Sequence, residues 1–87
     1  MKTNRQIAMD FAETYKEYKK IEEEKRKEWN ALFEKWEEVG YEDHELGDRV
    51  EAASKEYSEI QKKTDMCARL ALDYILKDQE ERINGKH

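Results

Sequence analysis

Apolar residues recur along the first half of the chain at the three- and four-residue intervals of an amphipathic α-helix. They are Ile7, Phe11, Tyr18, Ile21, Trp29, Leu32, Trp36 and Val39. Thr3 and Gln6 have the spacing of a capping box, which marks a helix start. Gly40 suits the left-handed residue that commonly ends a helix. The pattern predicts a first helix over about residues 4–39.

The second half of the chain alternates spacings of four and three, which is the heptad pattern of coiled-coil packing. Its positions are Leu46, Val50, Ala53, Tyr57, Ile60, Thr64, Cys67, Ala71 and Tyr74. The start is open to two interpretations, because Asp48 and Glu51 have capping-box spacing while Asp43 is also a good N-cap. We expect a start near Asp43, a turn at about 40–43, a helix over about 44–84 and a frayed tail at 85–87.

These elements predict an all-α fold, in which residues 1–87 form one long antiparallel helical hairpin, a two-helix coiled coil. With so short a turn, positions whose numbers sum to about 85 should face one another. This register pairs Phe11 with Tyr74 and Trp29 with Tyr57. Residues 22–28 are a charged run that places Lys25 at the interface, so we expect a polar middle between two apolar ends.

Residues 66–76 are apolar on nearly every side of the predicted helix, and a single neighbouring helix covers only one stripe. The residues that need a second surface are Ala68, Leu72, Ile75 and Leu76, with Ala8, Ala12 and Tyr15 beside them on the first helix. We expect a homodimer that forms a four-helix bundle. The alternatives are docking of a different protein and a folded-back N-terminus that covers the face.

Negative charge is concentrated around the predicted turn. Residues 34–51, here called the acidic segment, hold eight acids and two bases for a net charge of −6, whereas the whole chain carries −5. Such an end attracts a basic protein surface and repels nucleic acid. Helix dipoles explain the acids that begin the second helix but not those that end the first. The expected partner-binding residues are Glu34, Trp36, Glu37, Glu38, Tyr41, Glu42, Asp43, Glu45 and Asp48.

Catalytic and ligand-binding motifs are missing from the sequence. His44 has no second histidine nearby, and Cys67 is the single cysteine. The chain has no phosphate-binding glycine loop and no nucleophile motif, so we expect no enzyme activity, metal or cofactor. The N-terminal twenty residues lack the apolar core of a signal peptide, and no apolar run reaches 18 residues. We expect a cytoplasmic protein without membrane or direct nucleic-acid binding.

In its size, acidic balance and lack of catalytic motifs, the chain is similar to small accessory proteins of phages and mobile elements. That resemblance implies a protein that binds one large host protein as an inhibitor or adaptor. Two alternatives stay open at this point. One is an acidic mimic of nucleic acid that blocks a DNA- or RNA-binding protein, and the other is a structural assembly element with no separate target.

Overall fold

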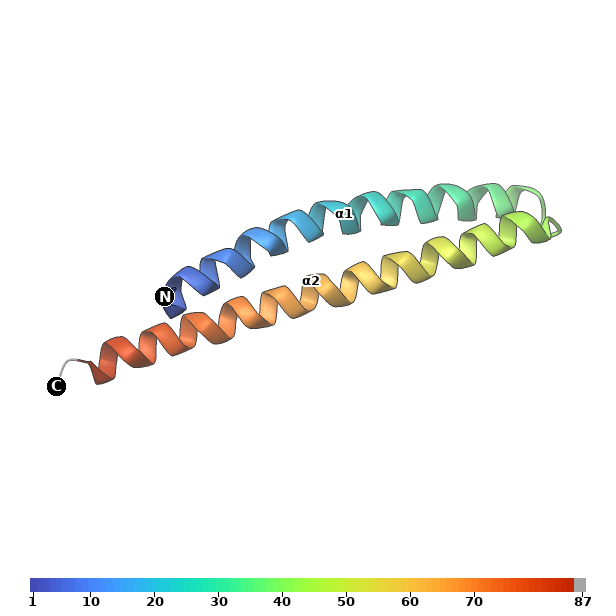
Figure 1. The fold of residues 1–87 in the computed structure, drawn as a ribbon. Coiled ribbons are helices and arrows are strands. Elements are labelled where there is room, and N and C mark those ends of the chain that lie inside the picture. Colours follow the sequence, from blue (N-terminus) through green and yellow to red (C-terminus); the bar gives the residue numbers. More distant parts are fainter. Residues whose placement is uncertain (86–87) are drawn as a thin grey trace.

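The structure is a computed structural model that describes residues 1–85, so residues 86 and 87 of the predicted frayed tail, including His87, lie outside the described residues. Helix α1 spans Asn4–Glu38 and helix α2 spans His44–Asn84, and the described part contains no strand. The two helices run antiparallel along one another and are joined by a single short turn (Figure 1). The molecule measures 69 × 18 × 14 Å. The predicted all-α helical hairpin is confirmed.

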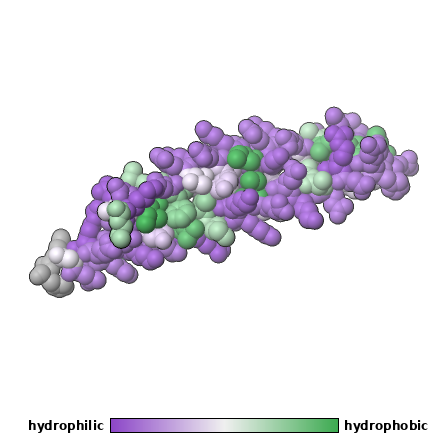
Figure 2. Space-filling view, in the orientation of Figure 1, coloured by the Kyte–Doolittle hydropathy of each residue, from purple (hydrophilic) through white to green (hydrophobic). Residues whose placement is uncertain are grey.

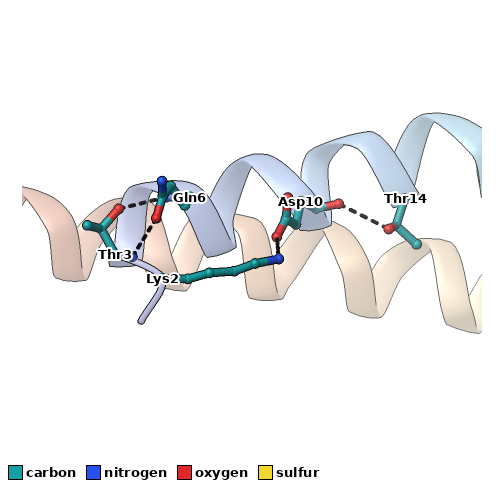
Figure 3. A network of polar contacts seen from close by, with 5 residues as sticks. All are labelled: Lys2, Thr3, Gln6, Asp10 and Thr14. Atoms are coloured by element: carbon teal, nitrogen blue, oxygen red, sulfur yellow. Dashed lines mark hydrogen bonds and ion pairs between the residues drawn. The ribbon is translucent and has the colours of Figure 1, made fainter.

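The start of α1 is fixed by the capping box that the sequence predicted (Figure 3). The Thr3 hydroxyl accepts a hydrogen bond from the Gln6 backbone N–H at 3.2 Å, and the Gln6 side chain accepts one from the Thr3 N–H at 2.9 Å. Lys2 forms an ion pair with Asp10, and the Thr14 hydroxyl donates to the Asp10 carbonyl. The capping box satisfies the backbone N–H groups of Thr3 and Gln6, which have no partner within the helix.

Two aromatic pairs confirm the predicted register between the helices. The rings of Phe11 and Tyr74 are stacked, with centroids 5.9 Å apart. Nearer the turn, the rings of Trp29 and Tyr57 are stacked at 6.3 Å. Each pair joins α1 to α2, so the helices keep one alignment over most of the length of α1.

Helix α2 uses the heptad positions that the sequence predicted, and all nine are buried or half-buried. The most enclosed are Val50, Thr64, Cys67 and Ala71. Because these four side chains are small, α1 can approach α2 closely where they lie.

Helix α1 packs on α2 with most of the predicted stripe, and six of its eight positions are buried or half-buried. Ile21 is 37% exposed and Val39 is also exposed, whereas Glu22 is only 8% exposed. Ala8, which was expected to need a second surface, is 3% exposed and already covered. The buried and half-buried positions repeat every four and three residues through Ala8, Phe11 and Glu22, so the heptad geometry places Glu22, and not the adjacent Ile21, against α2.

Charged and polar groups occupy the middle of the helix interface. Glu22 and Thr64 are buried there, and the half-buried Lys25 reaches across to Glu56, with Nζ 3.1 Å from Oε2. The hydrogen bond with Glu56 and the nearby charge of Glu28 raise the pKa of Lys25. The two helices are therefore held by apolar contacts toward each end and by polar contacts between them.

Candidate functional site

The turn ends α1 with a Schellman motif. The Gly40 N–H donates to the Glu37 carbonyl and the Tyr41 N–H donates to the Trp36 carbonyl, both at 3.0 Å. Gly40 has φ of 69° and Tyr41 has φ of 64°, so two consecutive residues are left-handed. Glycine adopts this conformation readily, whereas tyrosine adopts it at an energetic cost that the surrounding contacts must offset.

An aromatic cluster packs around this motif. The rings of Trp36 and Tyr41 meet edge to face with centroids 5.0 Å apart, which is the apolar contact typical of a Schellman motif. Phe33 contacts both rings, with centroids at 6.1 and 6.4 Å, and it also contacts Trp29 at 6.0 Å. Phe33 was not among the predicted site residues. Its spacing of four from Trp29 and three from Trp36 is the sequence signal that would have identified it.

The indole of Trp36 lies against the first turn of α2. A Cβ atom built on Gly47 would lie 3.2 Å from two carbons of this indole, so only glycine leaves room for the contact without displacing the ring. The indole Nε1 is buried and has no hydrogen-bond partner among the described residues. Trp36 therefore links α1 to α2 and supports the turn. Its predicted role as a binding anchor stays a prediction, since the side chain is half-buried.

Helix α2 begins at His44, with Asp43 as its N-cap, as expected. The Asp43 carboxylate accepts a hydrogen bond from the Leu46 N–H at 3.0 Å. Glu45 follows in the first turn, where its negative charge interacts favourably with the helix dipole. Asp43 thus has a structural role in addition to its charge.

Carboxylates of the acidic segment are exposed and are not paired with bases. All eight of its acids are exposed, and within residues 1–85 none of them forms an ion pair. Those eight are Glu34, Glu37, Glu38, Glu42, Asp43, Glu45, Asp48 and Glu51. Tyr41 is also exposed, with its ring edge packed on Trp36. The turn therefore presents a dense set of negative charges on a backbone held by hydrogen bonds and aromatic contacts.

The predicted apolar face lies far from the turn. Leu72 is 56% exposed, and Ala68, Ile75 and Leu76 are exposed as well. Leu72 follows His44 by 28 residues, or about 42 Å of helix. Figure 2 shows apolar atoms gathered over the half of the molecule that carries the chain ends, with hydrophilic atoms around them. The two candidate surfaces are thus at different ends of the hairpin.

Residues 1–85 hold no candidate metal site and no membrane-spanning helix. In that range no three or more His, Cys, Asp and Glu side chains gather in a way that could hold a metal ion. No helix there is both long enough and apolar enough to cross a membrane. Cys67 is buried and unpaired between the two helices.

Comparison of the chain with protein-family models, with curated proteins and with solved structures found no match.

Proposed function

We propose that the chain is a non-enzymatic module that binds a basic surface of a larger protein through the acidic segment and modulates that protein as an inhibitor or adaptor. The observation that carries the proposal is the set of eight exposed carboxylates without paired bases at one end of the hairpin. Clustered charge of one sign speeds association with a partner of opposite sign and selects against partners of like sign.

The packing of the turn supports this proposal. Carboxylates on a flexible loop lose conformational freedom when they bind, whereas carboxylates on an ordered backbone lose less. Here the Schellman hydrogen bonds and the contact between Trp36 and Gly47 hold the acidic segment in one conformation. Removing the charge should therefore weaken binding without changing the fold.

The test is affinity purification of the chain from extracts of the cells that naturally produce it, with elution by increasing salt. The test variant combines Glu37→Gln, Glu38→Gln and Glu42→Gln. A matched control neutralises three exposed acids far from the turn: Glu13→Gln, Glu17→Gln and Glu24→Gln. Both variants should keep the helical circular dichroism of the parent chain, because none of these side chains forms a hydrogen bond or ion pair within residues 1–85.

We expect the parent chain and the control to recover the same partner, and the turn variant to bind it roughly tenfold more weakly or worse. Retention of every partner by the turn variant would contradict the proposal. If added DNA or RNA competes for the recovered protein, the acidic segment acts as a nucleic-acid mimic. The net charge of +1 on the rest of the chain argues against that second function, because a mimic needs extended negative charge.

A further inference from the structure

The helix interface leaves an apolar face uncovered at the end of the hairpin formed by the start of α1 and the end of α2. Between the helices at this end is a hollow of about 480 Å³. It is lined by Arg5, Ala8, Met9 and Ala12 from α1 and by Ile75, Asp78, Gln79 and Arg82 from α2. Leu72 and Met9 are both more than half exposed at this end.

The exposed area of the whole chain is large for its mass. The chain exposes 7188 Å² of surface. A compact monomer of 10.5 kDa exposes about 5,400 Å², so the excess is about 1,800 Å². Stable protein interfaces bury roughly 1,200–2,000 Å² in total. The elongated shape of the hairpin, 69 × 18 × 14 Å, accounts for this excess, and it leaves enough exposed area for a contact of stable size.

We propose that the occupant of this face is a second copy of the chain, packed antiparallel so that the two acidic segments lie at opposite ends of the dimer. The face has the spacing that a coiled-coil helix needs. On α2, Ala68, Leu72 and Ile75 repeat at four and three residues, and on α1 Arg5, Met9 and Ala12 do the same. A second hairpin supplies two helices with these matching stripes.

Charge determines the orientation. Each acidic segment carries −6, whereas the remainder of each chain carries +1. A parallel dimer would hold two charges of −6 side by side, and an antiparallel dimer that overlaps only around Leu72 and Ile75 separates them. At the rim of the hollow Arg82 is paired with Asp78 of the same helix at 3.2 Å, so the net charge where the copies meet is small and does not oppose their association. This inference does not depend on the proposed binding role of the turn.

The first test is mass in solution, measured by sedimentation over a wide range of concentrations. We expect twice the chain mass of 10.5 kDa for the parent, and the single chain mass for Leu72→Glu. Met66→Glu is the matched control, because Met66 is equally exposed but lies on another side of α2. It should remain a dimer. A monomeric parent chain, or a Leu72→Glu variant that stays dimeric, would overturn the proposal.

The second test measures orientation and needs no change at the apolar face. A spin label is attached to Lys55→Cys in a chain whose native thiol is removed by Cys67→Ala. Lys55 precedes Leu72 by 17 residues, so the two labels should be about 50 Å apart in the antiparallel dimer and roughly 10–25 Å apart in a parallel one. The short distance, or no distance between chains, would refute the proposed arrangement. Sedimentation of Cys67→Ala alone checks that this background still associates.

Discussion

Gly47→Ala should stabilise the fold only when the Trp36 indole is absent. The new Cβ would lie 3.2 Å from indole carbons Cε2 and Cζ2 and 3.3 Å from Nε1. These distances are tighter than ordinary van der Waals contact, so the ring must shift. Phe33 and Tyr41 pack on the same indole, which restricts the directions in which it can move.

Two opposing contributions determine how Gly47→Ala changes the free energy of unfolding. Alanine in place of glycine within a helix stabilises by up to about 1 kcal/mol. Overpacking a fitted contact costs about 1–3 kcal/mol. Gly47→Ala should therefore leave the free energy of unfolding unchanged or lower it by as much as about 2 kcal/mol. Phenylalanine at position 36 lacks the indole ring atoms that clash, so in the Trp36→Phe background the same change should stabilise by up to about 1 kcal/mol.

Urea denaturation of the four proteins at one concentration, followed by circular dichroism, measures this coupling. The double-mutant cycle should give an interaction energy of about 1–3 kcal/mol between positions 36 and 47. Trp29 is present in all four chains and supplies an independent fluorescence signal. An equal effect of Gly47→Ala in both backgrounds would show that the close contact does not limit packing at the turn.

Three further substitutions test other parts of the hairpin. Thr3→Ala should lower the free energy of unfolding by about 1 kcal/mol, because it removes the α1 capping box, and urea denaturation would detect this. Glu22→Leu should raise the urea midpoint, because leucine at this buried heptad position adds apolar burial of up to about 1.5–3 kcal/mol, whereas the ion pair with Lys19 that is lost, at 3.8 Å, contributes about 1 kcal/mol or less; a lower midpoint would contradict this reasoning. The raised pKa of Lys25 means that its ion pair stabilises the fold below the ordinary lysine value of about 10.4 and that this contribution is lost as pH rises through the folded pKa. The stability difference between the parent and Lys25→Gln should therefore be constant near neutral pH and shrink in strong alkali, which denaturation at a series of pH values would measure.

The helices and their ends could be predicted from the sequence because each depends on neighbouring residues. Thr3 with Gln6 and the glycine at position 40 act within one helical turn, and the α2 heptad has a single good apolar stripe. Helix α1 was harder to predict in its middle, since Ile21 and Glu22 are adjacent candidates for one interface position and the structure buries Glu22. The choice between them depends on how the partner helix lies, which local spacing does not contain.

The candidate site could be predicted only in part, for a similar reason. Exposed acids around the turn follow from their positions in the sequence, and the structure places them on one end of the molecule. The contact between Trp36 and Gly47 depends on two helices meeting at a particular angle and distance. Neither residue by itself predicts this contact. Phe33 was not predicted as a site residue because it lies beside the predicted stripe and not on it.

The length of the hairpin also determines the order in which its parts fold. Trp36 and Tyr41 are close in sequence, whereas Asn4 and Glu81, which share a hydrogen bond at the other end, are 77 residues apart. Closing a longer loop costs more chain entropy, so pairing should begin at the turn and extend toward the termini. The terminal half then forms last and opens first, which native-state hydrogen exchange would record as weaker protection. Because the apolar face lies in that half, a second copy would slow amide exchange there and leave exchange at the turn nearly unchanged.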